Sequence, residues 1–174
     1  ENGVQSIQFG AFRGTNIHNL AIPSSVQLIE PFVFNQCHNL KTISVDPNNP
    51  NYTSINGILF TKNSDTLICC PELRCFLPIP PSVTSIDQSA FADYLLLKSI
   101  VIPPTVKVIG PSAFRACVNL TSIAISSSDV DIGQSILADC LNIETVILPF
   151  LPDIEFQNYI GLKKSNVQIR VALS

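Results

Sequence analysis

The sequence predicts a β-rich solenoid built from stacked units of about 23 residues. An apolar pair, usually Ala-Phe, recurs at spacings of 22, 57, 23 and 23 residues, and a short strand pattern accompanies it. The 57-residue step resolves into a regular unit of 23 residues and one of 34, so one unit contains an insertion. The recurring pairs are Ala11-Phe12, Val33-Phe34, Ala90-Phe91, Ala113-Phe114 and Ile136-Leu137.

Composition excludes several classes of protein. Of 174 residues, 46% are hydrophobic and only 13% are charged, which excludes a disordered chain. No apolar run reaches the 18 or so residues of a membrane-spanning helix. The net charge of −3 and the absence of a basic cluster argue against nucleic acid as a partner. Because the chain begins at Glu1 and has no methionine, we expect a processed chain or a piece of a longer one, with any signal peptide or membrane anchor outside it.

Each unit is expected to begin with a short half-buried strand, because apolar residues alternate at period two. Proline follows four of these strands and, having no N–H to donate, ends the ladder there. The predicted strands are 20–22, 43–45, 77–79, 100–102, 123–125 and 146–148.

The rest of the unit contains a second short strand and a turn. Apolar pairs such as Val106 and Ile109 predict the strand, and the Ala-Phe step predicts a single helical or 3₁₀ turn. An asparagine then recurs, and stacked asparagines are expected to form a ladder of hydrogen bonds to the neighbouring unit. Three cysteines share one interior position and are expected to pack as small hydrophobes: Cys37, Cys117 and Cys140.

The chain is expected to form a single domain over 1–174, with an insertion at about 46–73. The insertion predicts a hairpin of strands 58–61 and 66–69 joined by a turn at 62–65. The repeat fades after residue 151, although 167–171 predicts one more strand. The segment 151–174 is either a C-terminal cap or the start of a further, truncated repeat.

No residues suggest catalysis, a cofactor or a metal site. His18 and His38 are the two histidines, and Cys37 next to His38 lacks a third group to complete a nucleophilic site. The sequence Cys69, Cys70 and Cys75 lacks a fourth metal ligand. We favour reduced thiols there, with a disulfide from Cys75 to Cys69 or Cys70 as the alternative in an extracellular protein.

Two N-glycosylation acceptor patterns occur, at Asn51 and Asn119. Asn119 belongs to the predicted asparagine ladder, so its pattern is interpreted as accidental. Asn51 lies in the polar insertion and is the credible glycosylation candidate.

The repeating pattern L-x-x-I-x-I-P-x-S-V-x-x-I-x-x-x-A-F-x-x-C-x-N resembles the BspA-like class of leucine-rich repeats from Val4 to about Pro149. The resemblance implies a right-handed solenoid or horseshoe with a parallel sheet on its concave side and short turns on its convex side. Members are typically surface proteins of bacteria and protists, implicated in adhesion to host cells or extracellular proteins.

The candidate binding face is the outward side of the predicted concave sheet, where the side chains are small and carry little charge. Such a surface suits contact with a protein or a glycan better than ion binding. The alternative is a solvated sheet whose hydroxyl side chains reflect β propensity alone. The face comprises His18, Asn19, Ala21, Lys41, Thr42, Ser44, Lys98, Ser99, Val101, Thr121, Ser122, Ala124, Glu144, Thr145 and Ile147.

The leading hypothesis is therefore a non-enzymatic protein-binding module that is secreted or displayed at the cell surface and takes part in adhesion and host–pathogen interaction. The alternative is an intracellular, cytoplasmic repeat scaffold with the same fold. A membrane contact would require an anchor outside this chain. We expect no nucleic acid partner, and the sequence gives no oligomeric state.

Overall fold

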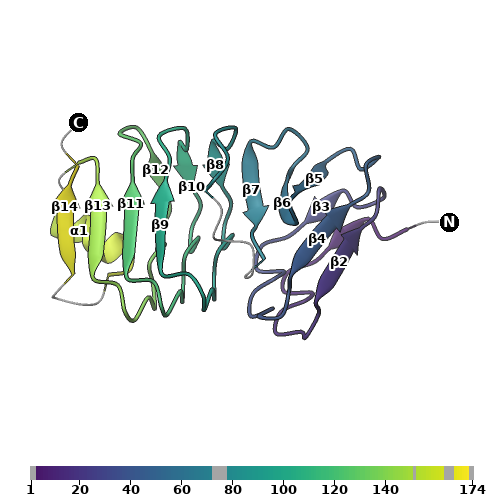
Figure 1. Ribbon diagram of the computed structural model, residues 1–174, viewed down its shortest axis with the longest axis horizontal. Coiled ribbons are helices and arrows are strands. Elements are labelled where there is room, and N and C mark those ends of the chain that lie inside the picture. Colours follow the sequence, from purple (N-terminus) through teal and green to yellow (C-terminus); the bar gives the residue numbers. More distant parts are fainter. Residues whose placement is uncertain (1–2, 72–77, 151, 163–166, 173–174) are drawn as a thin grey trace.

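The chain forms a β-solenoid of about seven turns, with mostly parallel strands and little helix, which confirms the predicted fold (Figure 1). The computed structural model describes residues 3–71, 78–150, 152–162 and 167–172. One turn of the solenoid is called a coil below. The coils are stacked along the long axis of the molecule, with the first residues at one end and β14 at the other (Figure 1).

The first strand of each coil contributes to what we call the concave sheet. It consists of β2 (Asn19–Ile22), β4 (Thr42–Val45), β9 (Ser99–Ile102), β11 (Ser122–Ile125), β13 (Thr145–Leu148) and β14 (Gln168–Val171). All pairings within it are parallel, in the orders β2-β4 and β9-β11-β13-β14. The five strands from β2 to β13 each begin one residue before the predicted start, and β14 confirms the strand expected near the C-terminus.

The second strands of the coils form two further parallel ladders. One consists of β1 (Ser6–Ile7) and β3 (Leu28–Ile29), and the other of β7 (Thr66–Cys69), β8 (Ser85–Ile86), β10 (Val108–Ile109) and β12 (Asp131–Ile132). These short strands confirm the prediction from the recurring apolar pairs. Ile86 of β8 and Ile109 of β10 point inward and are completely buried.

The interior is a column of apolar side chains from successive coils. Ile102, Val106 and Phe114 have no exposed surface, although they lie far apart within one coil. A single coil cannot cover these side chains, so their burial depends on the coils on either side. Phe91 and Phe114 stack with ring centres 5.0 Å apart and planes at 17°, which continues the column through the turns.

The Ala-Phe steps form successive hydrogen-bonded turns, and the predicted helical or 3₁₀ turn is wrong for the described coils. Each step contains two residues in the left-handed region four positions apart, as in Ser112 (φ 56°) and Ala116 (φ 56°). Left-handed residues interrupt a right-handed helix. They also aim N–H groups at the next coil: Ser112 donates to Gln134 and Ala116 to the carbonyl of Ala138.

The insertion contains three antiparallel strands. The predicted hairpin is confirmed as β6 (Ile58–Thr61) and β7, joined through 62–65. A further strand, β5 (Tyr52–Ile55), pairs with β6 across the two-residue turn Asn56-Gly57. Both turn residues have positive φ, as a tight hairpin of this kind requires.

The predicted strand at 77–79 is wrong where it can be compared. Residue 77 lies outside the described residues, and Pro78 and Ile79 are in no strand. Prolines at 78, 80 and 81 have no N–H to donate to a ladder. The concave sheet is therefore interrupted between β4 and β9, and the buried apolar residues fall into two clusters on either side.

At the C-terminal end, α1 (Ile154–Tyr159) takes the place of the turn in the last coil, and sequence reasoning missed it. Asp153 caps the helix by accepting a hydrogen bond from the Phe156 N–H at 2.7 Å. The carbonyls of Tyr159 and Ile160 then accept hydrogen bonds from Ser135 and Leu137, so the helix replaces a turn without breaking the stack.

The predicted asparagine ladder is present. Asn119 Nδ2 donates to the Leu95 carbonyl and Asn142 Nδ2 to the Val118 carbonyl, each at 2.8 Å, while Asn39 Nδ2 bonds Asn16 Oδ1. All three donating side chains are exposed, so the ladder lies at the surface and does not satisfy buried groups as expected.

We predict that Asn119→Ala lowers the free energy of unfolding by about 0.5–1.5 kcal/mol, the net value of one exposed hydrogen bond. Urea denaturation followed by circular dichroism measures the change. Asn158→Ala, which changes an exposed asparagine outside the ladder, serves as the control. A loss no larger than that of the control would show that the ladder does not contribute to stability.

Candidate functional site

The predicted site residues all lie on the outward side of the concave sheet, and none is buried. Three rows run across the strands. The row just before the strands contains His18, Lys41, Lys98, Thr121 and Glu144; the next contains Asn19, Thr42, Ser99, Ser122 and Thr145; the third contains Ala21, Ser44, Val101, Ala124 and Ile147.

The interruption of the sheet divides these rows into an N-terminal block and a C-terminal block. Residues on β2 and β4 form one block, and residues on β9, β11 and β13 form another. No strand pairing joins the two blocks within the concave sheet. Figure 1 shows the β5–β7 insertion between them.

The insertion partly covers the N-terminal block. The Ile43 N–H donates to the Gly57 carbonyl at 3.0 Å, and Ser54 Oγ donates to the Ile43 carbonyl. A Cβ at Gly57 would lie 2.6 Å from Thr42 Oγ1, so the hairpin turn rests directly on a predicted site residue. The C-terminal block is free of this cover.

The C-terminal block is a regular array. Ser122 pairs with Ser99 on one side and Thr145 on the other, and Ala124 pairs with Val101 and Ile147 in the same way. Parallel strands lie about 4.8 Å apart, so a hydroxyl row and a weakly apolar row run side by side. Val101 is 64% exposed, which makes it the most exposed large apolar side chain of the sheet.

The three cysteines of the interior column are buried. Each thiol of the column donates to a phenylalanine carbonyl of the preceding coil: Cys37 to Phe12 at 2.8 Å, and Cys140 to Phe114 at 3.1 Å. Burial raises the pKa of Cys140 to about 12, so its thiol stays protonated and unreactive. The predicted packing role of this column is confirmed.

The cysteines of the insertion differ from one another. Cys69 is a free, buried thiol whose pKa is raised chiefly by burial and further by the nearby Cys37. Cys70 is disulfide-bonded, so the favoured interpretation of reduced thiols is wrong for this residue. Cys75, the partner considered from the sequence, lies outside the described residues.

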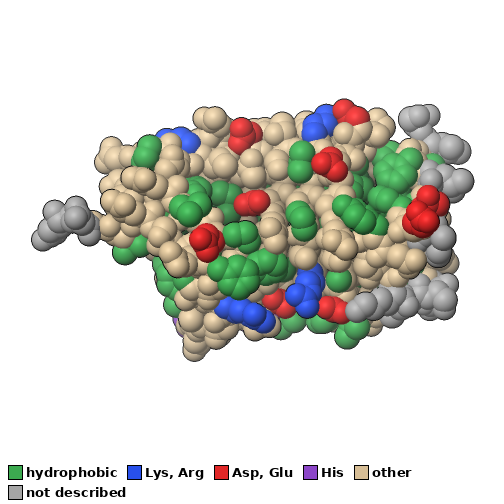
Figure 2. Space-filling view, turned by 180° about the vertical axis from the view of Figure 1, so that it is seen from behind, with side chains coloured by type: hydrophobic (Ala, Val, Ile, Leu, Met, Phe, Trp, Pro, Cys, Tyr) green, Lys and Arg blue, Asp and Glu red, His purple; other side chains and the backbone are tan. Residues whose placement is uncertain are grey.

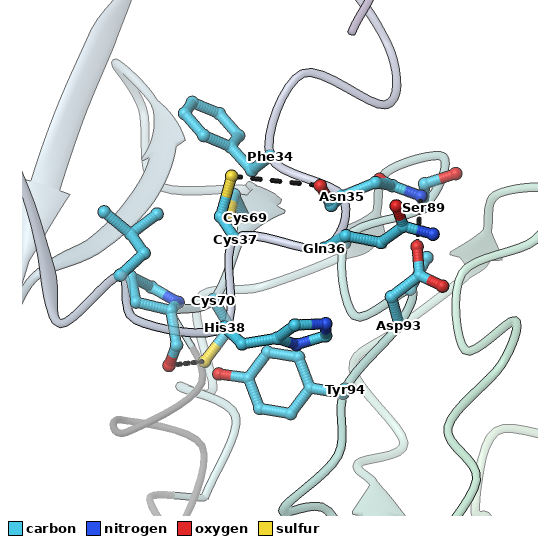
Figure 3. Close-up of a pocket in the computed structure, with 14 residues that line it drawn as sticks. Phe34, Asn35, Gln36, Cys37, His38, Cys69, Cys70, Ser89, Asp93 and Tyr94 are labelled. Carbon is cyan, nitrogen blue, oxygen red and sulfur yellow. Dashed lines mark hydrogen bonds between the residues drawn. The ribbon is translucent and has the colours of Figure 1, made fainter. Parts of the chain in front are cut away.

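The junction between the two halves of the solenoid, here called the seam, contains a small hollow between the turn at 32–37, the end of β7 and the turn at 89–94 (Figure 3). Its volume of about 30 Å³ suits water rather than an organic ligand. Across it, Asn35 Nδ2 donates to Asp93 Oδ2 at 3.0 Å. The repeat pattern does not indicate this contact, because the insertion separates the two residues in sequence.

Asn51, the glycosylation candidate, is exposed in the loop before β5. Its Nδ2 donates to the Gln27 carbonyl at 3.2 Å, so a glycan there would replace this hydrogen bond. Its glycosylation stays a prediction.

None of the helices in the described residues is long and apolar enough to span a membrane. No group of three or more histidine, cysteine, aspartate or glutamate side chains in the described part of the chain is arranged to hold a metal ion. The face opposite the concave sheet shows single charged side chains of both signs dispersed among apolar and neutral ones (Figure 2).

Solved structures share this fold. A leucine-rich repeat protein from Eubacterium ventriosum matches with a TM-score of 0.66 and 22% identity, over 83% of this chain and 45% of that one. The pneumococcal vaccine antigen PcpA matches with a TM-score of 0.68 and 19% identity, over 83% and 42%. A leucine-rich cell surface protein from Faecalibacterium prausnitzii matches with a TM-score of 0.68 and 25% identity, over 100% and 53%.

The chain thus spans about half the length of these proteins, and no curated protein matches it. The family model for the BspA type leucine-rich repeat region matches residues 1–76 and 68–169, in six copies. The chain belongs to the BspA-type leucine-rich repeat family.

Proposed function

We propose that the chain is a non-enzymatic adhesion module that binds a host or extracellular protein through the concave sheet, with the C-terminal block on β9, β11 and β13 as the centre of the contact. The observation behind this proposal is the in-register pair of rows, Ser99-Ser122-Thr145 and Val101-Ala124-Ile147. A rigid surface that combines hydroxyl groups with accessible apolar side chains suits a protein interface.

Rigidity supports the proposal. The outward residues of β11 and β13 alternate with buried ones, and Ile123, Val146 and Leu148 are at most 1% exposed. Because the backbone is fixed by the ladder on both sides of β11, binding would order few groups that are mobile in the free protein. Preorganisation of this kind lowers the entropic cost of association.

Charge is small and lies at the edge of the block. Lys98 and Glu144 flank it in the row before the strands, and Arg170 on β14 pairs in register with Ile147. Dispersed charges of both signs around a neutral centre resemble the rim of a protein interface. They favour neither nucleic acid nor an ion as the partner.

A location at the cell surface or outside the cell is part of the same proposal. It is supported by the printed description of the Faecalibacterium prausnitzii relative as a cell surface protein. The disulfide at Cys70 points the same way, because disulfides persist in oxidising compartments. The family is typically non-catalytic.

We predict that the double variant Ser99→Arg/Ser122→Arg loses at least about 90% of its binding to cells or extracellular matrix proteins, because two long charged side chains would stand in the centre of the contact. Binding is measured with the purified chain on a biosensor carrying matrix proteins, and on cultured host cells by flow cytometry.

The matched control is Ser85→Arg/Val108→Arg. These two residues pair in register on adjacent coils, in the ladder of β8 and β10, and neither is buried, so the number and spacing of the new charges are the same. Loss of binding in the first variant but not in the second supports the concave sheet. Equal binding by both variants and the unmodified chain would place the contact elsewhere.

A further inference from the structure

A polar hollow of about 440 Å³ lies away from the concave sheet, next to the turns of the last three coils. It is lined by Ser112, Arg115, Ser135, Ala138, Asp139 and Asn158, together with Gly161 and Leu162. This volume is more than ten times that of the hollow at the seam, and it is large enough for a small organic ligand.

The repeat itself creates the hollow. Arg115, Ala138 and Gly161 occupy the same position of three successive coils, 23 residues apart. Hydrogen bonds from Ala116 to Ala138 and from Ser135 to Tyr159 hold these coils in register. Arg115 therefore extends beside two positions that have no long side chain.

The same geometry brings polar groups together. Ser112, Ser135 and Asn158 also occupy one position of three successive coils, so two hydroxyls and an amide form a short row along the hollow. Within the described residues, these three side chains make no hydrogen bond. They remain available to a ligand.

Arg115 lines the same hollow as this row. Its Nε lies 3.3 Å from Asp139 Oδ2, and the terminal nitrogens of the guanidinium have no hydrogen-bond acceptor within the described residues. Both side chains of the pair are partly exposed. The guanidinium is held by one contact and presents its remaining N–H donors to the hollow.

The chemistry of these groups selects the class of ligand. Arginine only donates, whereas serine hydroxyls and the asparagine amide both donate and accept. An anion would meet the Asp139 carboxylate beside Arg115, and a cation would meet the guanidinium. A neutral molecule with several hydroxyl groups satisfies donors and acceptors together, and Ala138, Gly161 and Leu162 provide apolar surface for its C–H groups.

We propose that this hollow is a binding site for a neutral saccharide unit. The site lies apart from the concave sheet and does not depend on the function proposed for that sheet. Arg115 and Asn158 hold the hydroxyls of the sugar from two sides, and the small residue Ala138 leaves room for the ring.

The test is an NMR titration of the whole chain, observing the Arg115 Nε–H and Asn158 side-chain amide signals. The probes are methyl α-mannopyranoside, methyl β-galactopyranoside and methyl β-N-acetylglucosaminide, with inorganic phosphate as the anionic probe. We expect saturable shifts of both signals with at least one glycoside and none with phosphate.

Two variants separate binding from folding. Arg115→Ala removes the donors and Ala138→Leu fills the hollow, and each should weaken the affinity for the glycoside by about tenfold or more. Lys107→Ala is the matched control, because Lys107 is also exposed and paired with an aspartate of the next coil, Asp129. It should bind the glycoside unchanged.

Three results would overturn the proposal: no glycoside shifts either signal, phosphate shifts both of them, or the glycoside still shifts the Asn158 amide signal in both Arg115→Ala and Ala138→Leu. The dispersion of the backbone amide spectrum verifies that each variant is folded. Loss of binding at the concave sheet would not change any of these outcomes, so the two proposals fail separately.

Discussion

Phe114→Ala is expected to lower the free energy of unfolding by about 3–5 kcal/mol, the usual cost of truncating a buried aromatic side chain. Phe114 has no exposed surface, and its ring stacks on that of Phe91 in the preceding coil. The variant leaves a cavity between coils that each have little core of their own. Because a domain of this size is stable by about 5–15 kcal/mol, the loss is a large part of the total.

Denaturation in urea, followed by far-ultraviolet circular dichroism, measures this loss. Phe9→Ala is the control, since Phe9 is 62% exposed and its ring contacts that of Phe32. We expect that variant to lose no more than about 1 kcal/mol. If Phe114→Ala loses as little as Phe9→Ala, the aromatic column does not hold the coils together.

The regular coils are predictable from sequence because their periodicity is repeated many times. The strand β11 is recognised from Ile123 and Ile125, and its neighbours β9 and β13 show the same residue types at the same spacing. Agreement between copies fixes the register, since a shift by one residue would turn every apolar side chain outward. The bounds are therefore correct to within one residue.

The insertion is less predictable because it occurs once. Its turn Asn56-Gly57 is a strong local signal for a two-residue hairpin, and it could have identified β5 in addition to β6 and β7. The interruption of the concave sheet could not be found in this way, because Leu77-Pro78-Ile79 shows the apolar alternation of a strand. The prolines there have no N–H to donate to a ladder. The hydrogen bond across the seam, from Asn35 to Asp93, joins residues 58 positions apart, so local sequence does not indicate it.

The exposure of the site residues was predictable, but their division into two blocks was not. Alternation alone places Ser99 and Val101 on the outward side of β9. The cover over Thr42 depends on where the turn at Gly57 lies in space. Likewise, the hollow beside Arg115 results from small residues in two later coils and from α1, whose position the repeat pattern does not give.

Gly133→Val is expected to lower the free energy of unfolding by about 3 kcal/mol, at the upper end of the usual cost of overpacking. A Cβ at this position would lie 2.5 Å from the nitrogen of Pro111 and 2.7 Å from the carbonyl carbon of Gly110. These are backbone atoms of the preceding coil, so they cannot rotate away as a side chain can. The two coils must separate, and the pairing of β10 with β12 weakens.

Hydrogen exchange resolves the effect along the chain, and the amide of Gly133, which donates to Ile109 at 2.7 Å, should exchange faster in the variant. Gly14→Ala is the comparison that separates the cost of a steric clash from the cost of an unfavourable backbone conformation. Gly14 has φ 68° and open space around it, so only the left-handed conformation opposes a side chain, and we expect a loss of about 1–2 kcal/mol. If Gly133→Val costs less than Gly14→Ala, the backbones of successive coils are not as closely packed at this position as their geometry indicates.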